Sequence, residues 1–163
     1  MNTISENSKI WIYQSNQFFD LKTEEQINDK LNIFISNWNA HHQKLNAHYK
    51  ILHHLFIIII VDESNVTASG CSIDSSVKII KEIEEQFNIN FFNRSLISYF
   101  TNDAIEICDT TTFQQKIDSG FISPETIVFN NLISTYKELN TNWMIPIKDS
   151  WHQKIFTFNE VKN

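Results

Sequence analysis

The feature that most constrains the fold is the apolar run "LFIIIIV" at residues 55–61. A strand with one face in water alternates apolar and polar side chains, whereas this run is apolar at every position, so both of its faces must be covered. A run of seven residues is also far too short to cross a bilayer as a helix, which takes about 20 residues. We therefore expect a buried central strand at residues 55–62.

Two long helices are predicted beside this strand. The segment "LKTEEQINDKLNIFISNW" (21–38) has the spacing of a capping box at Thr23 and Gln26. Its apolar residues recur at helical spacing and form one buried stripe: Ile27, Leu31, Phe34 and Trp38. A second helix is expected from Ser72 to Asn88, with an inner stripe of Ile73, Val77, Ile80, Ile83 and Phe87. Strands are expected at residues 9–15 and 47–53.

The second half of the chain alternates irregularly between short elements. "SLISYFTNDAIEICD" is typical of a hairpin with its turn at Asn102-Asp103, and "TTFQQKIDSG" of a short helix ended by Gly120. "ETIVFNNLI" predicts a strand, and "STYKELNTNW" a short helix with a Thr135/Glu138 capping box. Because only two glycines and two prolines are present, the turns are expected to depend on Asn, Asp and Ser. The pattern predicts an α+β protein with a mixed, mostly antiparallel sheet, two main helices and two or three short ones, folded as a single-domain sandwich over residues 1–163.

Composition excludes several classes of function. The 163 residues include 13 Phe and four Trp, which indicates a globular core rather than disorder. The formal net charge is −6 and Arg94 is the sole arginine, so binding of nucleic acid through phosphate contacts is not expected. The N-terminus lacks the pattern of a secretory signal, and no segment is long enough for a membrane span. Cys71 and Cys108 stand in isolation, which favours reduced thiols and a cytoplasmic location.

The phrase "ASGCSIDSS" follows the buried strand and leads into the second long helix, and we call residues 62–75 the 62–75 junction. Free backbone N–H groups and the helix dipole favour an anion at such a place, and ligands gather where loops leave the carboxyl ends of strands. We expect a small polar or anionic ligand there. The structural alternative is that Ser72 is the N-cap, Gly70 makes the turn and Asp74 complements the dipole. The residues predicted to bind the ligand at this junction are Asp62, Ser69, Gly70, Cys71, Ser72, Asp74 and Ser75.

Two other functions stay open. In the first, Cys71 is a catalytic nucleophile with a pKa lowered by the helix terminus, which would require a histidine brought close by the fold. In the second, an aromatic surface pairs the protein with another protein or with itself as a homodimer, and no small-molecule site exists. Asn130, Asn131 and His152 are further candidates for contacting a ligand. For "SWH" at 150–152 a Trp anchor beside a helix cap is favoured over a Ser–His pair.

No nucleotide, metal or cofactor site is predicted. The chain has no GxGxxG, and "SNVTASGCS" lacks the first glycine and the Lys-Ser/Thr pair of a phosphate-binding loop. Five of the six histidines lie between residues 41 and 54, but their spacing matches no common zinc motif.

The segments "WIYQSN", "SNWNAH", "ASGCSIDSSV" and "VFNNLI", together with Trp143, Pro146 and residues 150–152, resemble a family of small uncharacterised bacterial proteins of about this length. The similarity covers nearly the whole chain and implies a free-standing bacterial cytoplasmic domain. Some members carry the label "ABC transporter ATPase". That activity requires a Walker A loop and a signature helix, which are not present in this sequence.

Overall fold

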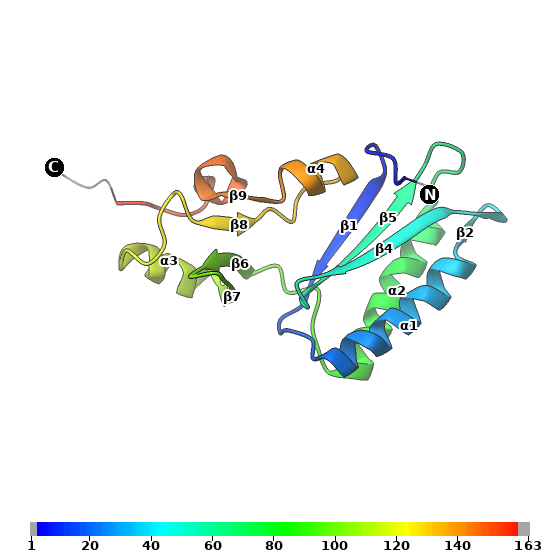
Figure 1. Cartoon of the computed structure of the whole chain (residues 1–163), viewed down its shortest axis with the longest axis horizontal. Helices are drawn as coiled ribbons and strands as arrows, with labels where there is room; N and C mark the ends of the chain where they lie inside the picture. The colour runs from blue at the N-terminus through cyan, green and yellow to red at the C-terminus, as the bar shows by residue number, and fades with distance from the viewer. Residues whose placement is uncertain (1–2, 160–163) are drawn as a thin grey trace. The chain divides into compact units, whose positions relative to one another are not determined.

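The computed structural model describes residues 3–159, which divide into two compact units. The first unit contains residues 3–92 and Ser134–Leu139, and the second contains Asn93–Ile133 and residues 140–159. Helices and antiparallel sheets are present in both, so the α+β class is confirmed (Figure 1). The single domain expected from the length stays a prediction.

The first unit is built on a sheet of β1 (Lys9–Gln14), β5 (Phe56–Asp62) and β4 (Asn46–Leu52), with β5 in the middle. Both neighbours run antiparallel to β5. Every side chain from Phe56 to Val61 is fully buried, which confirms the central strand expected from the apolar run.

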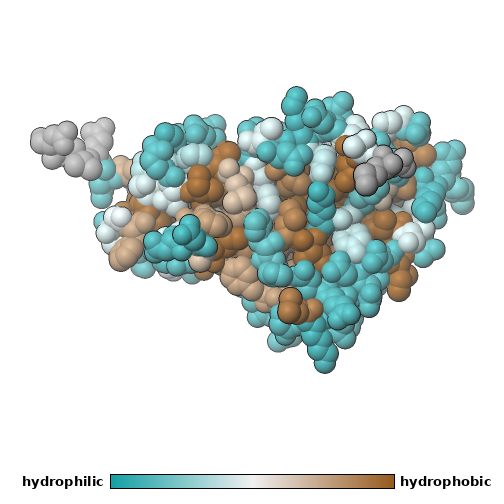
Figure 2. All heavy atoms as spheres, viewed as in Figure 1, coloured by the Kyte–Doolittle hydropathy of each residue, from teal (hydrophilic) through white to brown (hydrophobic). Residues whose placement is uncertain are grey.

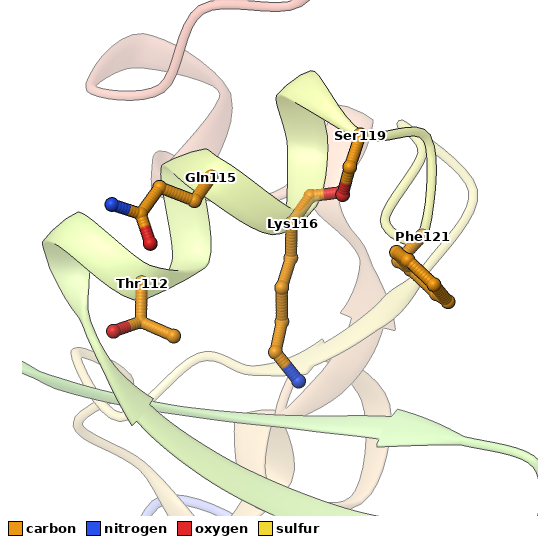
Figure 3. Close-up of a pocket in the computed structure, with 5 residues that line it drawn as sticks. All are labelled: Thr112, Gln115, Lys116, Ser119 and Phe121. Atoms are coloured by element: carbon orange, nitrogen blue, oxygen red, sulfur yellow. The ribbon is translucent and has the colours of Figure 1, made fainter.

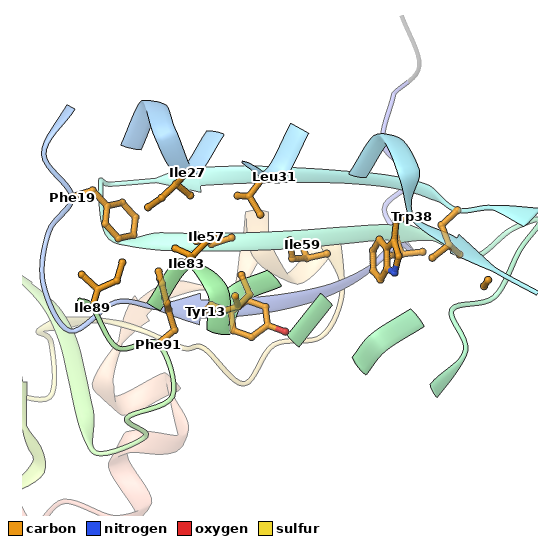
Figure 4. Packing of buried hydrophobic residues seen from close by; sticks show 14 residues of the cluster. Tyr13, Phe19, Ile27, Leu31, Trp38, Ile57, Ile59, Ile83, Ile89 and Phe91 are labelled. Atoms are coloured by element: carbon orange, nitrogen blue, oxygen red, sulfur yellow. The ribbon is translucent and has the colours of Figure 1, made fainter. Parts of the chain in front are cut away.

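The helices α1 (Leu21–Asn37) and α2 (Gly70–Phe87) lie on one face of this sheet (Figure 1). Alternate strand residues, including Tyr13, Ile57 and Ile59, pack against apolar residues of the two helices such as Leu31 and Ile83 (Figure 4). The outward side of α1 is mainly hydrophilic in the view of Figure 2, as an amphipathic helix requires.

The predicted cap of α1 is wrong. The N-cap is Asp20, whose carboxylate accepts a hydrogen bond of 2.7 Å from the backbone N–H of Thr23. Thr23 therefore lies inside the first turn, and it does not cap the helix as the Thr23/Gln26 spacing suggested. An aspartate at this position also complements the positive end of the helix dipole.

Two hairpin turns of the first unit use histidine where Asn, Asp or Ser was expected. His41-His42 joins β2 (Asn39–Ala40) to β3 (Gln43–Lys44), and His53-His54 lies between β4 and β5. All four histidines have left-handed backbone, with φ between 51° and 64°. Two consecutive left-handed residues match the twist of a tight hairpin, a role that Asn-Gly usually fills at lower cost.

The second unit contains a sheet of order β7-β6-β8-β9: β7 (Ala104–Asp109), β6 (Leu96–Thr101), β8 (Ile127–Phe129) and β9 (Met144–Pro146). Asn102-Asp103 forms the predicted turn between β6 and β7. The helix α3 (Thr110–Asp118) follows β7 and packs Phe113 and Ile117 into the core of this unit. The helix is followed by Gly120 at φ 80°, as predicted.

The remaining elements are short. The helix α4 (Tyr136–Thr141) begins with the predicted box, in which Glu138 accepts from the Thr135 N–H and the Glu138 N–H donates to the Thr135 hydroxyl. Two 3-10 turns follow β9, η1 (Ile147–Asp149) and η2 (Trp151–Lys154). Within residues 3–159, no helix combines the length and the apolar character that a membrane crossing needs.

Candidate functional site

The N-cap of α2 lies three residues before the predicted one. The N-cap is Ser69, with extended backbone, and its hydroxyl oxygen accepts from the N–H of Ser72 at 3.2 Å. Ser72 is inside the helix, 3% exposed, and its hydroxyl donates back to the Ser69 carbonyl at 2.8 Å. The two serines therefore close the first turn on each other, so the prediction of Ser72 as N-cap is wrong.

The inner side of the 62–75 junction is held by the core. The indole N–H of Trp38, at the end of α1, donates to the carbonyl of Ser72 at 2.8 Å. Gly70 is the first helical residue, it has no left-handed backbone, and a Cβ added to it would meet no atom within 4 Å. The expectation that Gly70 is needed for a turn or a close approach is therefore not met.

The outer side of the junction faces solvent but carries negative charge. Gly70 and Cys71 are exposed, and within the described residues their backbone N–H groups form no hydrogen bond with the protein. Asp74 is exposed in the same part of the helix, and the Glu63 carboxylate accepts from the Ala68 N–H at 2.9 Å in the preceding loop. Lys9 pairs with the Glu63 carboxylate at 2.7 Å, so Asp74 is the carboxylate here that opposes the attraction of the helix dipole for an anion.

The other predicted residues of the junction have local roles. The carboxylate of Asp62 accepts from the Ser64 hydroxyl and backbone N–H, and the hydrogen bond from the hydroxyl is the main cause of its lowered pKa. The hydroxyl of Ser75 donates to the carbonyl of Cys71 at 3.0 Å. Cys71 is a free, exposed thiol, and the hydrogen bonds of histidine side chains in the described part of the chain go to Glu24 and Ser150 rather than to Cys71. A nucleophile without a neighbouring base is weakly activated.

Asn130, Asn131 and His152 belong to the second unit, whereas the 62–75 junction belongs to the first. Both asparagines serve to hold Trp143. The side-chain oxygen of Asn131 accepts from the Trp143 indole N–H at 3.0 Å, and the Asn130 N–H donates to the Trp143 carbonyl at 2.7 Å. These contacts fix the segment before β9 against the end of β8.

Trp151 packs against the core of the second unit, as the anchor predicted for "SWH" should, but the structure contradicts the rest of that prediction. The Ser150 hydroxyl lies 2.7 Å from Nδ1 of His152, and both side chains are buried, with 2% and 1% exposed. Ser150 stands at the N-cap position of η2 but makes no side-chain cap bond. Burial lowers the pKa of His152 to about 4, so the imidazole is neutral at pH 7. The buried His152 ring stacks on the partly buried Trp151 with a centroid distance of 3.8 Å, and Trp151 packs against the core of the unit.

A pocket of about 330 Å³ lies beside α3, where no site was predicted (Figure 3). Thr112, Gln115, Lys116 and Ser119 follow one another at i, i+3, i+4 and i+7, so they share one face of the helix. Phe121 completes the wall from the turn after the helix. We call these five residues the α3 pocket. Figure 3 shows the Lys116 side chain extending between Thr112 and Gln115 on one side and Phe121 on the other.

The ammonium group of Lys116 is held by two residues of the β6–β7 hairpin. It donates to the hydroxyl of Tyr99 at 2.7 Å and to Oε2 of Glu106 at 2.9 Å. The Tyr99 hydroxyl in turn donates to the same Glu106 oxygen at 2.5 Å. The three groups form a closed ring of hydrogen bonds, which fixes the position of the positive charge.

The pKa shifts of this ring keep each group in its ordinary charge state. Burial, followed by the hydrogen bond to Glu106, raises the pKa of Tyr99 to about 12. The hydrogen bond to Tyr99, followed by that to Glu106, raises the pKa of Lys116 above its usual value. The hydrogen bond from Tyr99, followed by that from Lys116, lowers the pKa of Glu106. At neutral pH the ring therefore contains a neutral phenol, a carboxylate and an ammonium.

Part of this ring of hydrogen bonds could be predicted from the sequence. If Asn102-Asp103 is a two-residue hairpin turn, the residues on either side of it pair in order, and Tyr99 is then opposite Glu106. The structure has this register. The participation of Lys116 in the ring could not be predicted, because a lysine on a polar helix face usually points into water.

Comparisons with family models, with curated proteins and with solved structures find no match to this chain. The resemblance to a bacterial family stays a prediction. Within residues 3–159, no group of three or more His, Cys, Asp or Glu side chains is placed to hold a metal ion.

Proposed function

We propose that the protein binds a small anionic ligand in the α3 pocket. The observation that carries the proposal is Lys116, whose side chain lines a pocket of about 330 Å³ and whose ammonium is held by the hydroxyl of Tyr99 and the carboxylate of Glu106. This volume is at the lower end of the range of small-molecule sites. A positive charge that is already fixed loses little conformational entropy when a ligand binds, which favours recognition of an anion.

The protonation states favour binding over acid–base catalysis. A general acid or base works best when its pKa lies near the working pH. The pKa of Tyr99 is raised to about 12, and the pKa of Lys116 is raised from a value that is already high. Neither group exchanges its proton readily at neutral pH, so the ring is suited to holding charge.

The ligand class is the one that the sequence predicts, but the place is different. At the 62–75 junction the hydroxyls of Ser69 and Ser72 bond within the first turn, and Asp74 adds negative charge. At the α3 pocket the side chain of Lys116, whose ammonium is held in place, lines an open volume. The second arrangement supports an anion better, and binding at the 62–75 junction stays a sequence prediction.

The free thiols of Cys71 and Cys108 support a cytoplasmic location for this function, because a reducing compartment keeps cysteines unpaired. A homodimer stays a prediction from the sequence.

The proposal is tested by titrating benzoate, acetate and phosphate into the wild type and into Lys116→Gln, with binding followed by NMR chemical shifts. Loss of a charged hydrogen bond should weaken binding of the best anion about tenfold or more. Lys148→Gln is the matched control, because Lys148 lies in the same unit and pairs with Glu125 at 2.8 Å without lining the pocket.

Equal affinity in the wild type and Lys116→Gln would overturn the proposal, as would the absence of binding by all three anions. If Lys116→Gln does not fold, Lys116→Ala and Lys116→Arg give the same comparison, since only the arginine variant retains the charge.

A further inference from the structure

We infer that the ligand of the α3 pocket is a small aromatic monocarboxylate, and this inference rests on the proposed function. Three features of the pocket narrow the class of anion: the charge that is left for a ligand, the volume, and an aromatic ring fixed beside the lysine.

The charge favours an anion with a single negative group. Lys116 is the one cation among the five residues of the α3 pocket, and the Glu106 carboxylate already lies 2.9 Å from it. Two of the three N–H groups of the ammonium bond to Tyr99 and Glu106, which leaves one for a ligand. A dianion or a diphosphate would bring charges that no group in the pocket could neutralise, and unpaired charge is costly to desolvate.

The volume favours a ligand larger than an inorganic oxyanion. About 330 Å³ corresponds to roughly ten water molecules in the liquid. A tetrahedral ion of five heavy atoms that contacts Lys116 would leave most of this space to water. A carboxylate attached to a ring fills more of it, and its second oxygen can accept from the Thr112 hydroxyl or the Gln115 amide on the same helix face.

The ring of Phe121 is placed beside Lys116 by the end of α3. The Gly120 N–H donates to the Ile117 carbonyl at 3.0 Å, and the Phe121 N–H donates to the Lys116 carbonyl at 2.9 Å. This pair of bonds, with Gly120 at φ 80°, is the Schellman motif that ends many helices. The motif ties the backbone of Phe121 to that of Lys116. The phenylalanine ring and the charged lysine side chain therefore extend from backbone positions that are fixed relative to each other.

The Phe121 side chain is 82% exposed although it is large and apolar. In Figure 3 it forms the wall of the pocket opposite Thr112 and Gln115. A ligand ring that packs against Phe121 would cover apolar surface on both partners, and an aromatic pair adds a favourable term beyond the area that is buried.

Four probe molecules distinguish the contribution of the negative charge to binding from the contribution of the aromatic ring. Benzoate carries both, acetate carries the charge alone, benzamide carries the ring alone, and phosphate carries more charge without a ring. We expect benzoate to bind about fivefold or more tightly than each of the other three, because it alone uses both Lys116 and Phe121.

Phe121→Ala should lower the affinity for benzoate to about that of acetate and leave acetate unchanged. Phe18→Ala is the control, because Phe18 is also an exposed phenylalanine but lies in the first unit, and it should leave benzoate binding unchanged. If acetate or phosphate binds as tightly as benzoate and still depends on Lys116, the inference is overturned while the proposed function stands. If none of the probes binds, both are overturned.

Discussion

The helices α2 and α3 begin in the same way but use their next polar residues differently. Each has a polar N-cap with extended backbone that accepts from an N–H three residues on, Ser69 from Ser72 and Asp109 from Thr112. In α2 the next polar group turns inward, since Ser72 is buried against Trp38. In α3 the corresponding residues line a pocket.

The difference shows what distinguishes a structural cap from a binding site. A loop with serine, glycine and aspartate before a helix has the same composition in both roles, because a cap and an anion site need the same donors and acceptors. The separating observation is whether the protein itself uses those groups. At the 62–75 junction the hydroxyls of Ser69 and Ser72 bond within the first turn, so the exposed N–H groups of Gly70 and Cys71 are what is left for a ligand. The ammonium of Lys116 retains one N–H together with its positive charge.

The largest predicted effect is a dependence of stability on pH, which we expect from the second unit and not from the cap of α2. The cap of α2 is built from hydroxyl and amide groups that do not titrate, whereas the second unit contains His152, buried and neutral, with a pKa of about 4 against 6.5 for the unfolded chain. The unfolded state therefore binds more protons between these values. The contribution of His152 is fully present above pH 6.5 and is lost as the pH falls toward 4. Between pH 7.5 and 5 we expect a loss of about 2 kcal/mol, before most carboxylates titrate.

Urea unfolding at pH 7.5 and pH 5 measures this loss. His152→Gln should reduce the dependence on pH, because glutamine keeps an acceptor for Ser150 and does not titrate. His54→Gln, which removes an exposed histidine paired with Glu24, is the control and should retain the steep dependence. A pKa near 6.5 for His152 in the folded protein, read from its ring signals by NMR, would contradict the account even if His152→Gln fails to fold.

A smaller effect is expected at the cap of α2. Ser69→Ala removes the acceptor of the Ser72 N–H and should lower the free energy of unfolding by about 1 kcal/mol without changing benzoate affinity. Ser75→Ala is the comparison variant, because Ser75 is exposed and bonds only within its own helix, to the Cys71 carbonyl. If Ser69→Ala weakened ligand binding while stability stayed the same, the 62–75 junction would be the site.

Much of the fold could be predicted because its determinants are local. The run at 55–61 required a strand covered on both faces, and Asn102-Asp103 set the register of the β6–β7 hairpin. The errors arose where two residues could fill one role. Asp20 and Thr23 can each cap a helix, as can Ser69 and Ser72, and the choice depends on where the chain leaves the preceding loop.

The candidate site could not be predicted as a whole, because it joins a helix to a hairpin. Tyr99 and Glu106 follow from the turn, but whether Lys116 bends back to them or extends into water depends on how α3 lies on the sheet. The Ser150–His152 contact depends likewise on the local backbone, because Ser150 is extended immediately before the 3-10 turn that carries His152.

The most direct test uses the two glycines of the chain as reporters. Gly70 begins α2 at the 62–75 junction, and Gly120 stands between Ser119 and Phe121 of the α3 pocket. A protein labelled with ¹⁵N only at glycine gives two amide signals, which Gly70→Ala assigns, since a Cβ at residue 70 meets no atom within 4 Å. On titration with benzoate, the account predicts that the Gly120 signal moves in a saturable way and that the Gly70 signal stays in place. Movement of the Gly70 signal alone would contradict it.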